Sequence, residues 1–219
     1  MSLELLKKRI VKCRLCPRLV KFRETLPKRA SFQNETYLRK PAPGFGNPQA
    51  KLLILGLAPS AHGGNRTGRI FTGDESGRFL FQNLYQAGFA SKPHSDHLED
   101  GLKLKDCYIT AAVKCVPPQN KPLSSECENC ESYLLKEMEY LKKIKVVLTL
   151  GQLPFTRMTR LLKKKEGIKE NFHFKHGAVF AFKSLTLFAS YHPSPQNTYT
   201  GKLTDKMLIS LLTKIRNKL

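Results

Sequence analysis

The chain has 219 residues, and 38 Lys and Arg residues against 17 Asp and Glu residues give it a formal net charge of +21. Hydrophobic residues make up 41% and charged residues 25%, a balance that excludes an intrinsically disordered chain. No apolar run approaches the roughly 18 residues of a membrane span, and the charged first turns leave no hydrophobic core for a secretory signal. We therefore expect a soluble, cytoplasmic protein of one domain. Its strongly basic charge indicates a polyanion as its partner, and we expect no association with a membrane.

The first half of the chain predicts one helix, an irregular arm, one strand and a second helix. Apolar and basic residues alternate at helical spacing over residues 3–13. Residues 17–50 lack periodicity and contain five prolines, which predicts an arm crossing the surface. The apolar run 51–59 predicts a buried strand that Gly56 and Pro59 stop. A glycine-rich loop over 60–73 then leads to a helix over about 76–87.

The second half alternates strands and helices. We expect strands over 107–113, 145–150, 178–182 and 185–191, and helices over 125–144, 153–164 and 204–218. Ser125 and Glu128 form the expected capping box of the helix over 125–144. Buried strands alternating with helices predict an α/β fold, a three-layer α/β/α sandwich around a central, mainly parallel four-stranded sheet.

Six cysteines occur, and without an export signal clustered thiols indicate metal ligands rather than disulfides. Cys107 opens a strand and is expected to be a buried small hydrophobe. Two C-x2-C pairs suggest a four-thiolate zinc site, but Cys115 at a strand end is a further candidate. Four thiolates suit zinc or an iron–sulfur cluster equally well, and spacing alone does not decide between them; the candidates are Cys13, Cys16, Cys115, Cys127 and Cys130.

Two polar loops follow strands of the predicted sheet, at the edge where parallel sheets bind ligands. The first loop runs from Ala58 to Asp74 and carries four glycines among charged and hydroxyl residues, without the pattern of a P-loop. The second runs from Tyr191 to Lys202 and begins with His192. A lone His at a strand end is more often structural, but two such loops beside an Asp and an Asn favour a catalytic site.

At these loops the sequence resembles the uracil-DNA glycosylase superfamily, and within it the family 5 (B-type) enzymes. The first motif is Gly-Leu-Ala-Pro-x-Ala-His-Gly-x-Asn-Arg-Thr-Gly-Arg at 56–69, followed by Phe-Thr-Gly-Asp at 71–74. The second is His-Pro-Ser-x-Gln-Asn-Thr at 192–198, and the segment 108–122 is similar to the family's middle strand and loop. Leu57 and Ala111 stand where family 4 enzymes have Glu and Asn, which favours family 5.

The resemblance implies a monofunctional DNA repair glycosylase that flips uracil out of DNA and hydrolyses its N-glycosidic bond. From the chemistry of this reaction we expect catalytic roles for Asp74, which orients water or stabilises the sugar cation, for His192, which donates a hydrogen bond to the departing base, and for Asn120, which reads the base edge. The base-binding residues are expected to be Gly56, Leu57, Ala58, Phe71, Asn120 and His192. The DNA-binding residues are expected to be His62, Asn65, Arg66, Arg69, Lys114, Ser194, Gln196, Asn197, Thr198 and Lys202.

The resemblance also implies a structural 4Fe-4S cluster held by Cys13, Cys16, Cys115 and Cys130, with Cys127 as an ordinary helix residue. In this view residues 1–219 form a single uracil-DNA glycosylase-like domain, whose N-terminal helix and irregular arm (1–50) are tied down by the cluster. The expected partners are double- and single-stranded DNA containing uracil or other deaminated bases such as hypoxanthine, with the protein a monomer associated with the nucleoid. The alternatives are a non-enzymatic, metal-containing nucleic-acid-binding module and, less favoured by the charge, a cluster-based redox protein.

Overall fold

The computed structural model describes residues 2–219 and has a six-stranded sheet in the order β1-β3-β2-β4-β6-β5. The four central strands are parallel: β2 (Leu52–Gly56), β3 (Cys107–Ala111), β4 (Val146–Leu150) and β6 (Thr186–Ser190). Two short edge strands, β1 (Phe45–Gly46) and β5 (Val179–Ala181), pair antiparallel with β3 and β6. The four-stranded sheet of the sequence prediction is therefore the parallel centre of a larger sheet.

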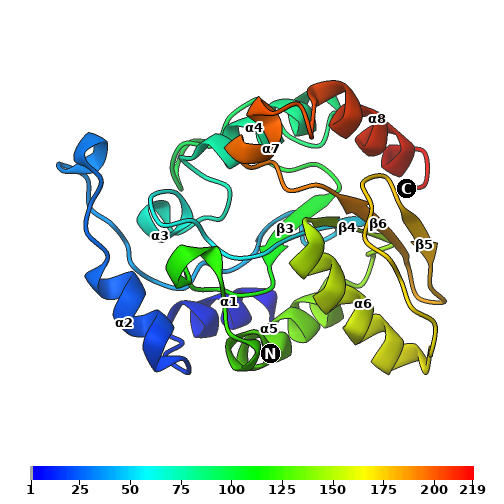
Figure 1. Ribbon diagram of the computed structural model, residues 1–219, viewed down its shortest axis with the longest axis horizontal. Coiled ribbons are helices and arrows are strands. Elements are labelled where there is room, and N and C mark those ends of the chain that lie inside the picture. Colours follow the sequence, from blue (N-terminus) through cyan, green and yellow to red (C-terminus); the bar gives the residue numbers. More distant parts are fainter. Residues whose placement is uncertain (1) are drawn as a thin grey trace.

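Helices cover both faces of the sheet, which confirms the three-layer arrangement (Figure 1). One face is covered by α4 (Glu75–Gln86) and α8 (Asp205–Arg216). The other is covered by α1 (Leu3–Val11), α5 (Ser124–Tyr140) and α6 (Gln152–Glu166). The remaining helices are α2 (Pro17–Thr25), α3 (Gly64–Thr67) and α7 (Pro195–Tyr199), with 3-10 turns η1 (Ala30–Phe32) and η2 (Pro118–Asn120).

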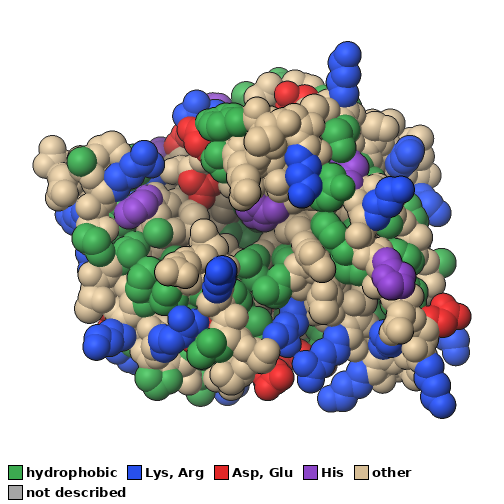
Figure 2. Space-filling view, viewed as in Figure 1, with side chains coloured by type: hydrophobic (Ala, Val, Ile, Leu, Met, Phe, Trp, Pro, Cys, Tyr) green, Lys and Arg blue, Asp and Glu red, His purple; other side chains and the backbone are tan. Residues whose placement is uncertain are grey.

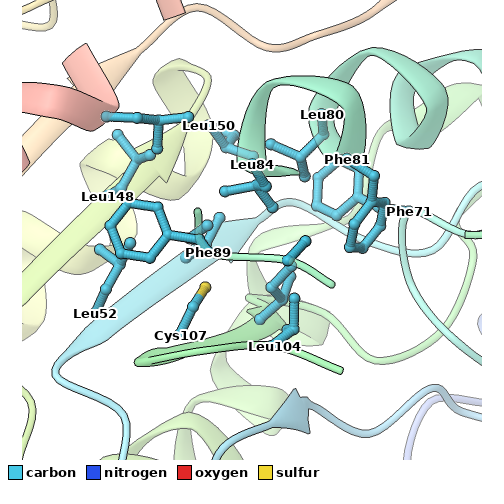
Figure 3. Close-up of a cluster of buried hydrophobic side chains, with 14 of the residues drawn as sticks. Leu52, Phe71, Leu80, Phe81, Leu84, Phe89, Leu104, Cys107, Leu148 and Leu150 are labelled. Carbon is cyan, nitrogen blue, oxygen red and sulfur yellow. The ribbon is translucent and has the colours of Figure 1, made fainter. Parts of the chain in front are cut away.

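The side chains of β2 alternate between two hydrophobic cores. Leu52 and Ile54 lie in the core under α4 and α8, which Figure 3 shows with Leu80, Phe81 and Leu84 of α4. Leu53 and Leu55 point to the opposite core, under α1, α5 and α6. Because both faces are buried, the strand reads as a continuous apolar run, and this made it predictable from the sequence.

Four local predictions are wrong. Residues 17–25 are not part of an irregular arm but form α2, because Pro17 stands at the first helical position, where its missing N–H costs nothing. Helix α5 begins at Ser124, and its capping carboxylate is Glu126, which accepts the Leu123 N–H at 2.7 Å in place of Glu128. The same helix ends at Tyr140, and β3 ends at Ala111, each earlier than predicted.

Candidate active site

Gly56, Phe71 and His192 meet at the carboxyl edge of the sheet. The Phe71 and His192 rings have centroids 6.0 Å apart with planes inclined by 32°. A Cβ at Gly56 would lie 2.8 Å from the Phe71 ring, so glycine at the end of β2 is what allows the ring to lie there. Phe71 itself has φ 54°, a left-handed conformation that is strained for a bulky residue and typical of functional loops.

His192 follows β6 at the start of the second loop. Burial lowers the pKa of His192 to about 4, so its imidazole is neutral near neutral pH and keeps one N–H donor. Its imidazole makes no hydrogen bond within residues 2–219. Its backbone carbonyl accepts a hydrogen bond from Asn197 Nδ2 at 2.8 Å, which fixes the loop to α7. The side chain is therefore held in place yet free to donate to a ligand.

Asp74 both caps a helix and lies on the wall of a cleft. Its Oδ1 accepts the Gly77 N–H at 2.8 Å as the N-cap of α4, and its Oδ2 accepts the Ser60 hydroxyl. Burial raises the pKa of the Asp74 carboxyl above its ordinary value, opposed by these two hydrogen bonds and by the charge of Arg66. A partly buried carboxylate of raised pKa is suited to orient water or to face a developing cation.

The cleft beside Asp74 has a volume of about 620 Å³. Figure 2 shows this face hollowed near its centre, with acidic and histidine side chains around the hollow. The cleft is lined by the arm and first loop, and by the segment around His94 and His97. Sequence reasoning missed His94 and His97 because they stand in an irregular segment outside both motifs.

Asn120 lies at the same edge of the sheet, on η2, and is exposed. Gln119 and Asn120 have φ 52° and 56°, so two consecutive residues take the left-handed conformation after Pro117 and Pro118. The Asn120 side chain makes no hydrogen bond within residues 2–219. The structure thus leaves its amide available to a ligand.

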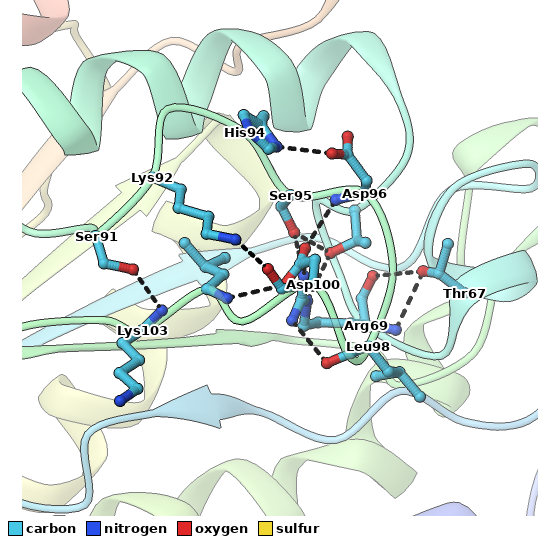
Figure 4. A network of polar contacts seen from close by, with 12 residues as sticks. Thr67, Arg69, Ser91, Lys92, His94, Ser95, Asp96, Leu98, Asp100 and Lys103 are labelled. Atoms are coloured by element: carbon cyan, nitrogen blue, oxygen red, sulfur yellow. Dashed lines mark hydrogen bonds and ion pairs between the residues drawn. The ribbon is translucent and has the colours of Figure 1, made fainter.

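Three predicted DNA contacts are wrong because their side chains are internal. Lys114 is 1% exposed and donates to Glu137 Oε2 at 2.7 Å and Thr110 Oγ1 at 2.6 Å. Arg69 is ion-paired with Asp100 and bonded to Thr72 and Ser95, in the network of Figure 4. Asn65 is 1% exposed.

The remaining members of the predicted DNA-binding set are placed differently. Arg66 is nearly buried, pairs with Glu35 and lies over the Phe32 ring at 4.0 Å, where it lines the cleft. Gln196 and Lys202 are exposed. Partly exposed are His62, Ser194, Asn197 and Thr198. Their contact with DNA stays a prediction.

Four cysteines line one pocket between α2, α5 and the segment after β3: Cys13, Cys16, Cys115 and Cys130. Cys127 is buried nearby but does not line this pocket. The six cysteines are free thiols, and within residues 2–219 no group of three or more His, Cys, Asp or Glu side chains has an arrangement that could hold a metal ion.

Two polar side chains point at the sulfurs of this pocket. Arg23, 3% exposed, donates from Nη1 to Cys115 Sγ at 3.1 Å, and Asn129 Nδ2 lies 3.4 Å from Cys16 Sγ. Burial raises the pKa of the Cys115 thiol, and the Arg23 charge opposes that rise. Because a buried guanidinium needs a negative partner, the pocket is suited to an anionic group held by thiolates.

Among residues 2–219, no helix combines the length and the apolar character that crossing a membrane requires.

Comparisons with known proteins identify the family of the chain. Residues 43–216 match the uracil DNA glycosylase superfamily. The chain is 44% identical to a type-5 uracil-DNA glycosylase of Thermus thermophilus, over 93% of this chain and 92% of that protein. It is 41% identical to one of Pyrobaculum aerophilum, over 94% of this chain and 88% of that protein.

More distant proteins resemble the chain less. A type-4 uracil-DNA glycosylase of Sulfurisphaera tokodaii is 27% identical over 88% of this chain and 74% of that protein. The crystal structure of wild-type Pedobacter heparinus SMUG2 covers 92% of this chain and 96% of that one, at 13% identity and a TM-score of 0.44, too weak a likeness to support an argument. The chain therefore belongs to the uracil DNA glycosylase superfamily and, within it, to the type-5 uracil-DNA glycosylases.

Proposed function

We propose that this protein removes uracil from DNA by hydrolysing the N-glycosidic bond, and leaves an abasic site. The observation that carries the proposal is the meeting of Phe71 and His192 over Gly56, at the carboxyl edge of the sheet, in a chain that belongs to the type-5 family. A base inside a duplex is out of reach of such a recessed site. The nucleotide must therefore be flipped into it, at an unstacking cost of a few kcal/mol.

In this mechanism each side chain meets one demand of the reaction. The Phe71 ring stacks on the flipped base, and Asn120 offers a donor and an acceptor to its Watson–Crick edge. The neutral imidazole of His192 donates to the base oxygen on which negative charge develops, where exclusion of water strengthens the bond. The carboxylate of Asp74 orients water toward the anomeric carbon, or stabilises the sugar cation electrostatically.

The substrate range extends beyond uracil. Leu57 supplies an apolar, half-buried side chain at the end of β2, beside Ala58, where a polar group would restrict which base edges fit. We therefore include hypoxanthine and other deaminated or modified bases, in double- and single-stranded DNA. The exposed basic side chains give sequence-independent affinity for phosphates. The protein would act as a monomer at the nucleoid.

The four cysteines of the pocket would hold a 4Fe-4S cluster. Four thiolates around a four-iron, four-sulfur core carry a net negative charge, which the buried guanidinium of Arg23 would balance. The cluster would cross-link the N-terminal segment to the segment after β3, and it would supply no redox chemistry to the hydrolysis. Substitution tests whether Cys115 or Cys127 is the fourth ligand: Cys115→Ser should lose the iron, whereas Cys127→Ser should keep it.

The test is incubation of the purified, iron-quantified protein with duplex oligonucleotides that carry one uracil, hypoxanthine or thymine, followed by alkali to break abasic sites. The proposal predicts cleavage at uracil and hypoxanthine and none at thymine. Excision confined to uracil would overturn the wider substrate range. Tight DNA binding by an iron-loaded preparation that cleaves no oligonucleotide would favour a non-enzymatic binding module.

A further inference from the structure

Two buried residues, Arg23 of α2 and Asn65 of α3, lie between the cysteine pocket and Asp74. They are 3% and 1% exposed, and neither belongs to the proposed base pocket. Arg23 Nε and Asn65 Oδ1 are both buried without a hydrogen-bond partner in the described chain, although polar groups in protein interiors are usually paired. Burying an unpaired polar atom costs free energy. Because Arg23 and Asn65 bear this cost and lie between two functional sites, we infer that they do more than fill space.

The Arg23 side chain contacts the cysteine pocket. Its Nη1 donates to Cys115 Sγ at 3.1 Å and to the Cys13 carbonyl at 3.2 Å. The carboxylate nearest to it, that of Glu24, is 3.4 Å from Nη2, but it is half-exposed and already shared with Arg14. The charge of Arg23 is therefore satisfied chiefly by what the cysteine pocket contains.

Asn65 continues the connection to the reaction centre. Its Nδ2 donates to the Arg23 carbonyl at 3.3 Å, and its backbone N–H donates to the Ser60 carbonyl at 2.9 Å. The Ser60 hydroxyl in turn donates to Asp74 Oδ2. Hydrogen bonds thus join Cys115 Sγ to the Asp74 carboxylate through Arg23, Asn65 and Ser60.

The backbone of the arm reinforces this connection. The Leu38 N–H donates to the Arg66 carbonyl at 2.9 Å, and the Arg39 N–H donates to the Asn65 carbonyl at 3.0 Å. Arg39 also donates to the Glu24 carbonyl at the end of α2. A displacement of α2 would therefore be felt by α3 along two routes.

We propose that Arg23 and Asn65 are positioning residues that make base excision depend on an occupied cysteine pocket. With an anion in the pocket, Arg23 is neutralised, α2 is fixed and Asn65 holds Ser60 against Asp74. Without it, the buried charge of Arg23 has no adequate partner, α2 moves and the Ser60–Asp74 hydrogen bond loosens. This inference rests on the proposed function, because it assigns Asp74 to the reaction centre.

The decisive variant is Asn65→Ala, which removes the side-chain hydrogen bond from α3 to the Arg23 carbonyl and leaves the backbone route through Arg39, and every cysteine, in place. Its matched control is Asn83→Ala, since Asn83 is also fully buried, donates from Nδ2 and has an unpaired Oδ1, but lies on α4 away from the cysteines. We expect Asn65→Ala to keep its iron and sulfide per chain and its Kd for uracil DNA, while the single-turnover excision rate falls at least about tenfold. The acid limb of the pH–rate profile should also move to higher pH, because the Ser60 hydrogen bond that lowers the Asp74 pKa is weakened.

Three further measurements test the coupling itself. Arg23→Met should lose iron, whereas Arg18→Met, on the same helix but paired with Glu126, should keep it. In the double variant Arg23→Met/Asn65→Ala the loss of rate should be smaller than the product of the two single losses. Removal of iron from the wild-type protein should speed amide hydrogen exchange over residues 60–67.

Excision by Asn65→Ala at the wild-type rate, with an unmoved acid limb, would overturn the inference and leave the proposed function intact. If Asn65→Ala does not fold, Asn65→Leu, which keeps the side-chain volume, replaces it. The same single-turnover rate and pH–rate profile are then measured. Unchanged hydrogen exchange over residues 60–67 after iron removal would also overturn it. A wild-type protein that does not excise uracil would instead refute the proposed function, which is a separate result.

Discussion

Asp74 has two roles that one substitution can separate. The structure makes it the N-cap of α4, so its replacement by alanine removes a helix cap as well as a carboxylate. Asparagine caps a helix about as well as aspartate does, since its side-chain oxygen can still accept the Gly77 N–H. Asp74→Asn therefore removes the charge and keeps the cap, whereas Asp74→Ala removes both.

The expected magnitudes differ enough to be measured. Loss of the cap costs roughly 0.5–2 kcal/mol, which in a chain of this size lowers the Tm by roughly 2–4 °C per kcal/mol. Loss of a positioned general base lowers the rate by roughly 10²–10⁴-fold. Asp74→Asn should keep the wild-type Tm and lose at least about a hundredfold in single-turnover excision of uracil, while Asp74→Ala should lose both rate and Tm.

The assay is single-turnover cleavage with enzyme in excess, beside thermal unfolding of the same preparations. Ser60→Ala is a graded companion: it removes a hydrogen bond that lowers the Asp74 pKa, so the acid limb of the rate should move to higher pH. Asp74→Asn with a rate within about tenfold of wild type would refute the catalytic role and leave Asp74 as a helix cap.

Three other predictions follow from particular contacts. Gly56→Ala places a Cβ 2.8 Å from the Phe71 ring, so the KM for uracil DNA should rise; an unchanged KM would contradict the stacking role. Lys114→Met leaves Glu137 buried without its partner and should cost about 3–5 kcal/mol of stability, while the salt dependence of DNA binding, measured by titration, stays as in the wild type. Burial holds the folded pKa of His192 at about 4, below the roughly 6.5 of an unfolded His. Because the unfolded chain binds this proton first, the Tm should fall as pH drops from about 6.5 to about 4, and it should fall less in His192→Asn. Equal falls in the two proteins would contradict the lowered pKa of the His192 imidazole.

Much of the fold could be predicted from the sequence because the central strands are buried on both faces. The continuous apolar runs of β2 and β4 report that burial directly, and the helices that follow them are amphipathic. Helix α2 was missed because residues 17–50 contain five prolines and show no clear periodicity, although proline is favoured at the first helical position, where Pro17 stands. The strand β1 has two residues, too few for any period to be visible.

The site was partly predictable because its motifs follow the ends of strands. The two motifs follow the ends of β2 and β6, and topology brings those ends to one edge of the sheet, so Phe71 and His192 could be placed from the sequence. The burial of Arg69 and Lys114 could not be predicted, because their acidic partners stand 31 and 23 residues away in the chain. A basic side chain near a motif looks the same in the sequence whether it faces DNA or a buried carboxylate.

Hydrolysis of the bond between uracil and its sugar must release the free base and the abasic strand together. A duplex with one uracil would be incubated with the iron-loaded wild-type protein, and the free base and the abasic strand would be quantified in the same sample. We expect one free uracil for each abasic site, and neither product from a duplex with thymine at that position. A preparation that binds the uracil duplex tightly but releases no free base would contradict it.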